Sequence, residues 1–330
     1  MNIVVFGEGR RVGLLDGDYV VDVNNAVAAY LSATMHPNDA RWLADARAPS
    51  ELVKFIVGGK ESLALAQTGA SHVKGSNDGS LVQPLGSVRL RAPWPGRRVF
   101  ANGANYAEHS ARARSNAGKT VTVEEVEKQA REFGAPGGFT KVPHEVMGHE
   151  DPITYPSRTE RFDYEGELAV ILGVAGKNIP ADRAIEHIYG VSLANDWSIR
   201  DDRLHYLQST SFNLQKNFDC SVSLGPCINV SGLDTQNIDI SLEVNGEQRQ
   251  NYSTRSMIFS VAETLSYLSR DFTLLPGDVL ICGTGPGTAV DSSKRDAAGK
   301  LPPERFLKLG DVVEVKSPQI GCLRNRIVAG

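Results

Sequence analysis

Short apolar runs separated by glycine, proline and asparagine dominate residues 89–330 of the chain. Apolar runs of roughly four to eight residues bounded by turn residues are typical of β-strands. The dipeptide Asn245-Gly246 also predicts a tight hairpin, because both residues tolerate the positive φ angles of a two-residue turn. We predict strands at Val99–Asn102, Gly166–Gly173, Val191–Ala194, Ile238–Val244, Glu247–Asn251, Val279–Cys282 and Val312–Val315.

Helical patterns are fewer in this region. Apolar positions recur at helical spacing in Ser256–Leu268, and Ala181–Glu186 predicts a shorter helix. Thr122–Glu132 predicts a third helix, with Thr122 and Glu125 at the spacing of a capping box. Strands that do not alternate with helices argue against a doubly wound sheet. The pattern therefore predicts a β-rich α+β fold, either a barrel or a sandwich.

Residues 1–88 form a smaller predicted unit of mixed α/β character. Arg11–Leu15 and Tyr19–Val23 are apolar runs on either side of Asp16-Gly17-Asp18, which is a hairpin signal. A polar, glycine-containing stretch at Gly75–Leu85 follows, so we predict a domain boundary near residue 88. Helices are predicted at Asn24–Leu31, Pro37–Ala46 and Glu51–Val57, the last with Ser50 as its N-cap.

The composition limits the classes of partner. The chain has 330 residues, 41% of them hydrophobic, and a formal net charge of −4. It lacks the basic field that holds a polyanion, so we expect no nucleic-acid partner. The first residues show no signal-peptide pattern, and no apolar run approaches the roughly 20 residues that span a bilayer. We therefore expect a cytoplasmic protein with no membrane partner and with reduced cysteines.

Acidic residues at alternating positions precede the apolar run Ala169–Leu172. Residues two apart on a strand face the same side, so Glu165 and Glu167 point together, with Asp163 in register. Converging carboxylates beside a buried strand are costly unless a hard cation neutralises them. Mg²⁺, Mn²⁺ and Ca²⁺ all prefer oxygen ligands. The spacing alone leaves open a solvated strand edge with two exposed glutamates.

Two further polar positions follow predicted strands. Asp196 comes directly after Val191–Ala194. It is either a site residue or the N-cap of a helix that would bring Arg200 onto the same face. His109 follows a loop of glycine and asparagine after another strand. It is a candidate general acid or base, because the pKa of histidine lies near neutrality, or else a structural histidine.

The glycine-rich loop Gly283–Thr288 follows the strand at Val279–Cys282. Pro286 interrupts the loop and no Lys-Ser/Thr pair follows it, so the loop is not a phosphate-binding P-loop. We expect its backbone amides and the Thr284 hydroxyl to bind a carboxylate instead.

Taken together, these segments resemble the fumarylacetoacetate hydrolase family. The resemblance runs in one order from about Val99 to Ile327, which is far more specific than any single motif, and it is looser in the N-terminal unit. It implies a mixed β-roll or barrel, usually a homodimer, that holds Mg²⁺ or Mn²⁺, with Ca²⁺ also acceptable. The motifs are GANYAEH at Gly103–His109, DYEGEL at Asp163–Leu168, GVSLANDWSIR at Gly190–Arg200, KNFD at Lys216–Asp219 followed by Leu224-Gly225-Pro226, Asn245-Gly246, and Gly283-Thr284.

The resemblance also assigns roles to positions of this chain. Its metal ligands fall on Glu165, Glu167 and Asp196. Its acid/base histidine falls on His109, and its active-site lysine falls on Lys216. We place contacts with the substrate at Tyr106, Arg200, Arg203, Gly283 and Thr284.

Two features depart from the family pattern. Some members carry an acidic residue three positions after the histidine, where it orients a water, whereas this chain has Arg112 there. The chain also carries an insertion at about 110–141, and we expect it to act as a lid that excludes water. Glu124, Glu125 or Glu132 of this insertion could replace the missing acidic partner, as could a network of waters.

The residues and the resemblance predict an enzyme that acts on a small 2-oxo acid. Such an acid can chelate a divalent cation through its carboxylate and keto oxygens, and the cation then stabilises an enolate. Hydrolysis, decarboxylation and double-bond migration share this step. Our first expectation is hydrolysis of a carbon–carbon bond in an acylpyruvate-like or fumarylacetoacetate-like 2,4-dioxo acid, in the catabolism of aromatic compounds. An isomerase, hydratase or decarboxylase is the alternative, and a non-catalytic metal-binding or small-molecule-binding module is the alternative of another class.

Overall fold

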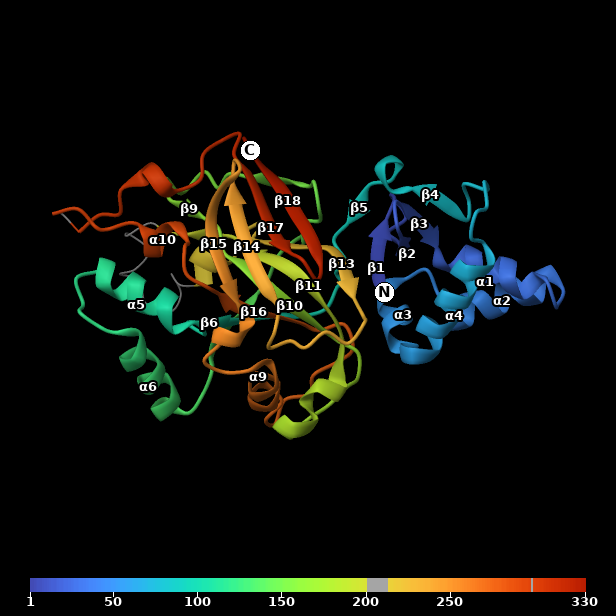
Figure 1. Cartoon of the computed structure of the whole chain (residues 1–330), viewed down its shortest axis with the longest axis horizontal. Coiled ribbons are helices and arrows are strands. Elements are labelled where there is room, and N and C mark those ends of the chain that lie inside the picture. The colour runs from blue at the N-terminus through green and yellow to red at the C-terminus, as the bar shows by residue number, and fades with distance from the viewer. Residues whose placement is uncertain (201–212, 298) are drawn as a thin grey trace.

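A computed structural model describes residues 1–200, 213–297 and 299–330 of the chain (Figure 1). It contains an eleven-stranded main sheet, a five-stranded sheet and a two-stranded ribbon. The predicted strand-rich α+β fold is confirmed. Each sheet is an open path of strands, so within the described ranges none closes into the barrel that was one of the two expected forms.

The main sheet runs in the order β4-β3-β2-β1-β13-β11-β10-β16-β6-β7, with β5 also paired to β1. Strands β16 and β6 are parallel, and the other pairs are antiparallel. The strands span Asn2–Phe6 (β1), Arg11–Asp16 (β2), Tyr19–Asp22 (β3), Val82–Pro84 (β4), Leu90–Arg91 (β5), Val99–Gly103 (β6), Gly137–Lys141 (β7), Gly166–Leu172 (β10), Ile188–Asp196 (β11), Val222–Asn229 (β13) and Val279–Thr284 (β16).

The five-stranded sheet lies in front of the main sheet in Figure 1 and has the order β15-β14-β17-β18-β8. Its predicted hairpin at Asn245-Gly246 is confirmed, with φ angles of 53° and 79° at the two turn residues. The strands of this sheet and of the ribbon span Pro152–Thr154 (β8), Asp239–Val244 (β14), Glu247–Ser253 (β15), Val312–Ser317 (β17) and Gly321–Val328 (β18), and Phe162–Asp163 (β9) and Ser198–Ile199 (β12).

Four of the α-helices belong to the N-terminal unit and lie together at one end of the molecule (Figure 1). The α-helices span Val23–Ser32 (α1), Pro37–Arg47 (α2), Leu52–Val57 (α3), Gly59–His72 (α4), Ala107–Asn116 (α5), Val123–Phe133 (α6), Val261–Leu268 (α9) and Ala289–Ser292 (α10). Short 3₁₀ helices occur at Leu85–Ser87 (η1), Ala181–His187 (η2), Thr254–Ser256 (η3) and Pro303–Arg305 (η4).

The observed helix ends test the predicted caps and boundaries. The capping box of Thr122 and Glu125 is confirmed at the start of α6. Ser50 was the wrong N-cap for α3, because Glu51 takes that position and makes no capping hydrogen bond with its side chain. The helix predicted from Ser256 begins only at Val261, where Ser260 and Glu263 form a second capping box. The segment predicted at 181–186 is a 3₁₀ helix rather than an α-helix.

Strand β10 lies at the centre of the core and is buried along its whole length. Leu168 and Val170 belong to one apolar cluster together with side chains of the five-stranded sheet. Ala169 and Ile171 belong to a second cluster, which includes the N-terminal helices. A strand buried on both faces must be apolar at every position. The polar pair Glu165 and Glu167 at its start is therefore the exception that calls for an explanation.

The main sheet crosses the predicted domain boundary, since β1 pairs with β13. The division near residue 88 stays a prediction. The insertion at 110–141 contains most of α5, all of α6 and β7, and β7 pairs with β6 at the edge of the main sheet. None of the helices in the described ranges combines the length and the apolar character needed to cross a membrane.

Candidate active site

Three buried carboxylates meet where β10 begins and β11 ends. Ligand oxygens of Glu165, Glu167 and Asp196 all lie within 4.8 Å of one another. The backbone holds these segments together, because the amide of Asp196 donates to the carbonyl of Glu165 at 2.9 Å. The Asn195 side chain also accepts from the amide of Glu165 at 2.9 Å. The structure thus brings together the three residues predicted as metal ligands.

Three cations surround this carboxylate cluster. Lys216 Nζ lies 2.5 Å from Glu165 Oε2 and 2.8 Å from Asp196 Oδ2. Lys141 Nζ donates to Asp196 Oδ1 at 2.6 Å, and its side chain is fully buried. The Arg200 guanidinium bonds Glu165. These cations pair with Glu165 and Asp196. Of the three carboxylates of the cluster, Glu167 is therefore the one without a cationic partner in the described part of the chain.

The unequal pairing gives the carboxyl groups opposite pKa shifts. Burial raises the pKa of Glu165, but the nearby charges of Lys216 and Arg200 outweigh burial and leave that pKa far below its ordinary value. Burial and the adjacent charges of Asp196 and Glu165 raise the pKa of Glu167 well above its ordinary value. Two titratable groups pushed in opposite directions within one cluster mark a candidate functional site.

Arg200 reaches the cluster through the β9–β12 ribbon, in which Ser198 pairs with Asp163. Its Nε donates to Asp163 Oδ2 at 3.0 Å. Asp163 in turn accepts from the backbone amide of Ala289 at 2.8 Å. The helix that was considered after Asp196 does not form, so Asp196 is not an N-cap. Through these contacts Arg200 joins the acidic strand to the α10 loop, and its contact with a substrate stays a prediction.

His109 has an acidic partner that the sequence did not reveal. Its Nδ1 lies 2.8 Å from Asp291 Oδ2, and the side chain of Asp291 is fully buried. Asp291 also accepts from the backbone amide of Gly287. Asp291 thus takes the place for which glutamates of the insertion and a water network were the candidates, and one of those glutamates, Glu125, caps α6. Arg112 pairs with Glu108 on the same helix instead.

The glycine-rich loop binds a carboxylate of the protein itself. The amide of Gly283 donates to Glu167 Oε2 at 2.7 Å. The Thr284 hydroxyl donates to the carbonyl of Gly166 at 3.0 Å and accepts from Gln250 Nε2 at 2.8 Å. Gly283 has a φ of +87°, and a side chain there would crowd Asn105. The two groups predicted to hold a substrate carboxylate therefore order the cluster in this structure.

Tyr106 lies beside the cluster with its ring edge-on to Tyr252 at 5.0 Å. Its hydroxyl is buried and has no hydrogen-bond partner within the described ranges, so it remains available to a bound molecule. Arg203, the remaining predicted substrate contact, lies outside the described residues.

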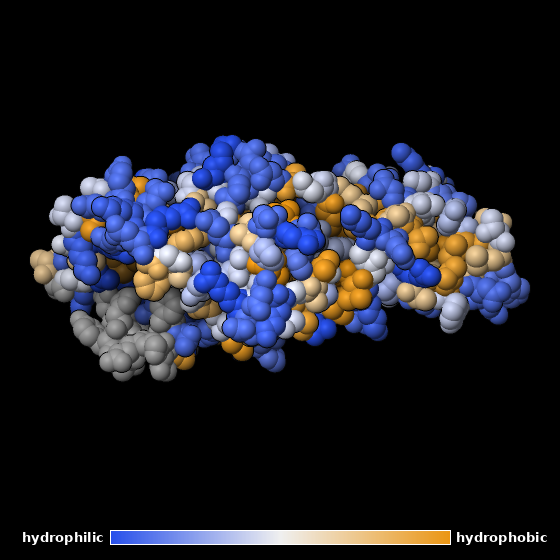
Figure 2. Space-filling model, turned by 90° about the horizontal axis from the view of Figure 1, so that it is seen from below, coloured by the Kyte–Doolittle hydropathy of each residue, from blue (hydrophilic) through white to orange (hydrophobic). Residues whose placement is uncertain are grey.

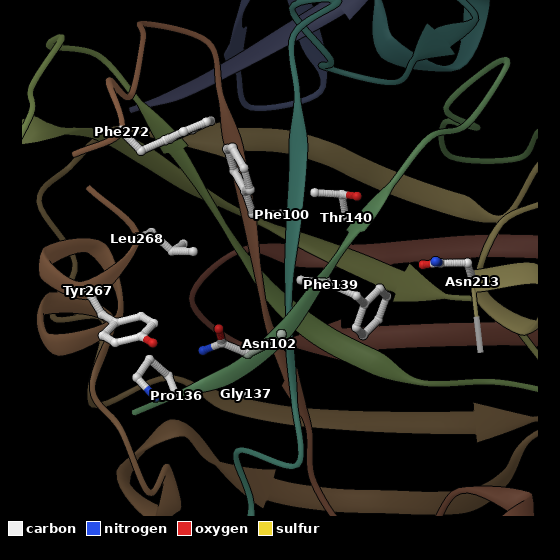
Figure 3. A pocket seen from close by; sticks show the side chains of 12 residues that line it. Phe100, Asn102, Pro136, Gly137, Phe139, Thr140, Asn213, Tyr267, Leu268 and Phe272 are labelled. Atoms are coloured by element: carbon white, nitrogen blue, oxygen red, sulfur yellow. The ribbon is translucent and has the colours of Figure 1, made fainter. Parts of the chain in front are cut away.

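A hollow of about 840 Å³ lies along β6 and β7 (Figure 3). Asn102, Phe139 and Tyr267 are among the residues that line it. The ring of Phe139 also lies 5.2 Å from Lys216 Nζ, so this residue borders both the hollow and the lysine of the cluster.

Three functional residues were missed from the sequence. Lys141 and Asp291 reach the site from the insertion and from α10, and the Ser198 hydroxyl oxygen accepts a hydrogen bond from Lys216 Nζ at 2.7 Å. Lys141 is the last residue of β7. This strand was not predicted, because it begins with two glycines and shows no alternation of apolar and polar residues. Asp291 follows the glycine-rich loop by only a few residues, and that position was its sole signal.

The donor set suits a hard divalent cation. Three carboxylates in one buried cluster match the all-oxygen ligands of Mg²⁺ and Mn²⁺, and no sulfur or imidazole ligand from residues 1–200, 213–297 or 299–330 belongs to this cluster. Glu167 has no cationic partner in the described ranges, which agrees with its raised pKa, and a bound cation would neutralise its charge. The fold and the site thus define an α+β protein of open sheets with a buried acidic cluster that could hold a metal ion beside a lysine.

Comparison with known proteins identifies the family. Residues 98–328 match the model of the fumarylacetoacetate (FAA) hydrolase C-terminal domain, and the chain belongs to this family. Oxaloacetate tautomerase YisK of Bacillus subtilis is 32% identical over 84% of this chain and 87% of its own length. The human mitochondrial oxaloacetate tautomerase FAHD2B is 29% identical over 86% of this chain and 82% of its own.

Solved structures agree with this assignment. The alignment with the fumarylacetoacetate hydrolase of Exiguobacterium antarcticum covers 100% of both chains, with a TM-score of 0.70 and 30% sequence identity. The maleylpyruvate hydrolase of Sphingobium sp. SYK-6, solved with manganese and pyruvate, has a TM-score of 0.68 at 21% identity and shares the fold. The relatives include tautomerases and hydrolases. The family match therefore places the chain in an enzyme family but does not identify its reaction.

Proposed function

We propose that the protein is a divalent-metal-dependent enzyme of 2-oxo acids that interconverts the enol and keto forms of oxaloacetate or a close analogue. The observation that carries this proposal is the buried cluster of Glu165, Glu167 and Asp196 with Lys216 against it. Two relatives that match most of this chain are named oxaloacetate tautomerases. An isomerase was one of the alternatives at the level of the sequence, and these relatives favour one kind of isomerase, a tautomerase, over a hydrolase.

Tautomerisation moves one proton between carbon and oxygen. The carbon next to the keto group loses or gains a proton while the keto oxygen gains or loses one. A cation bound by the carboxylate cluster would supply Lewis-acid polarisation of that oxygen. Lys216 adds positive charge on the same side, where it stabilises negative charge that develops on the substrate. His109, oriented by Asp291, would carry the proton to and from carbon.

A direct assay tests this proposal. The enol form of oxaloacetate absorbs in the ultraviolet and the keto form absorbs less, so the purified protein loaded with Mn²⁺ should speed the decay of the enol band in proportion to enzyme concentration. Treatment with a chelator should remove the effect, and added Mn²⁺ should restore it. An unchanged decay rate with fully metal-loaded protein would rule out this activity.

Hydrolysis of an acylpyruvate is the second candidate, and one contact favours it. The His109–Asp291 pair resembles the His–carboxylate arrangement that activates a nucleophile, and a hydrolase needs such a base to activate water. To distinguish the two, acylpyruvates should be incubated with the metal-loaded protein and the products separated. Release of pyruvate and a free acid would identify a hydrolase, whereas an unchanged carbon skeleton would leave tautomerisation as the activity.

A further inference from the structure

A hollow of about 470 Å³ lies between the N-terminal helices and the ends of two strands of the main sheet. Ile56 and Leu63 line it from the N-terminal unit, and Val174, Ile185 and Leu233 line it from the other side. Figure 2 shows hydrophobic residues gathered on this face of the molecule where the two parts meet. The volume falls in the range of roughly 300–1,000 Å³ that small-molecule pockets occupy.

Tyr189 lines this hollow and carries an unsatisfied polar atom. Its hydroxyl is buried and has no hydrogen-bond partner in the part of the chain that the structure describes. The pairing of β10 with β11 is irregular beside Tyr189. Gly173 leaves the space that the tyrosine occupies, because a Cβ on Gly173 would lie 3.0 Å from Tyr189 Cβ. A buried hydroxyl without a partner is destabilising, so a ligand atom that accepts a hydrogen bond from it would remove that cost.

The charges at the hollow favour an anion. Lys60 at the start of α4 lines it, is exposed, and forms no ion pair within the described ranges. The acidic Glu186 also lines the hollow, but Arg183 neutralises it at 2.8 Å. The unpaired charge near the apolar walls is therefore positive. A single carboxylate on the ligand would complement it.

A second copy of the chain fits these observations less well. Val174 and Ile185 are each 53% exposed, so they could meet another protein surface. The Tyr189 hydroxyl is buried, however, and a protein surface laid over the exposed residues would leave it without a partner. A small molecule satisfies both the apolar walls and this hydroxyl.

We propose that this junction pocket binds a small monocarboxylate with an apolar body, such as an arylalkanoate. Its apolar part would pack on Ile56, Leu63 and Leu233, while Tyr189 and Lys60 bind its polar atoms. No residue that lines the pocket is among the bonded partners of the carboxylate cluster. The pocket is thus a second site, and its existence does not depend on the reaction proposed above.

Isothermal titration with 3-phenylpropanoate tests the proposal, with 3-phenylpropanamide as the uncharged counterpart. Mn²⁺ and excess oxalate should be present, so that the carboxylate cluster is already occupied. We expect saturable binding of the acid. The K60M substitution should weaken it by about fivefold without changing binding of the amide, as expected for one partly exposed charge pair. K54M, which removes an exposed lysine outside the pocket, is the matched control and should leave both affinities unchanged.

Two further variants keep the test decisive. I185W should fill the mouth of the pocket and abolish binding, and the residue is exposed enough to tolerate the change. Y189F should weaken binding while leaving the protein at least as stable to heat, because it removes only the unpartnered hydroxyl. Absence of saturable binding, loss of binding when oxalate is added, or equal binding by wild type and I185W would each overturn the proposal.

Discussion

Glu167 differs from the two other carboxylates of the cluster in the partners that surround it. Glu165 and Asp196 are held by lysine and arginine, whereas among the described residues Glu167 accepts a hydrogen bond only from the Gly283 amide. A buried carboxylate without a cationic partner favours its neutral form, which explains its raised pKa. Such a residue is well placed to bind a metal ion.

The E167Q substitution tests this reading. Glutamine has the size of a protonated glutamate, so the metal-free protein should unfold at the same temperature or slightly higher. Affinity for Mn²⁺ should fall by at least about 100-fold, because even residues that only support a metal ligand often cost 10–100-fold. Titration with Mn²⁺ and a thermal melt of the metal-free protein measure the two effects. Full Mn²⁺ affinity in E167Q would contradict its role as a ligand.

Asp291 offers a second test at this scale. The D291N variant should keep its Mn²⁺ affinity, because Asp291 bonds His109 and Gly287 rather than the cluster. Turnover should fall by about 100-fold or more, since a misoriented histidine loses most of its acid–base contribution. E108Q removes an exposed carboxylate from the same helix as His109 and serves as the control. Equal losses in both variants would show that general charge, not the pair, matters.

At the scale of elements, two capping boxes hold helices of different importance. Thr122 caps α6, which is exposed over most of its length, and Ser260 caps α9, which packs against η2. Losing an N-cap side chain costs typically about 1 kcal/mol. Whether that cost lowers the local stability of the helix or the free energy of global unfolding depends on how much of the helix packs against the core.

We therefore expect T122A and S260A to act differently. T122A should speed amide hydrogen exchange in α6 while the midpoint of global unfolding changes little. S260A should lower the free energy of global unfolding by about 1 kcal/mol, because α9 is joined to the core. Serine at position 122 would keep the capping oxygen and should behave like wild type. A uniform change in exchange across the chain in T122A would refute local fraying.

For the whole molecule, metal binding should stabilise the fold. The carboxylate cluster joins β10 to β11 in the middle of the main sheet, so an ion bound there favours the native state over the unfolded one. At a concentration about 100 times Kd, the expected stabilisation is about 2.7 kcal/mol. Differential scanning calorimetry should show a rise in Tm of several degrees with Mn²⁺ in wild type. The E167Q variant should show no such rise at the same concentration.

Local chemistry made much of the chain predictable. Asn245-Gly246 sets its own hairpin, Thr122 and Glu125 cap their own helix, and the apolar run after Glu167 identifies the central strand. These features depend on residues a few positions apart. The motif order from Val99 to Ile327 also placed the three carboxylates correctly in one cluster.

Only the tertiary structure decided which distant residues complete the site. His109 and Asp291 are 182 positions apart, and Lys141 and Asp196 are 55 apart. Such contacts depend on how β7 and α10 pack around β10, and no local propensity encodes that packing. The sequence by itself determined the strands, the turns and the acidic pair. The fold determined their partners, because a buried charge is stabilised by whichever opposite charge the packing brings near it.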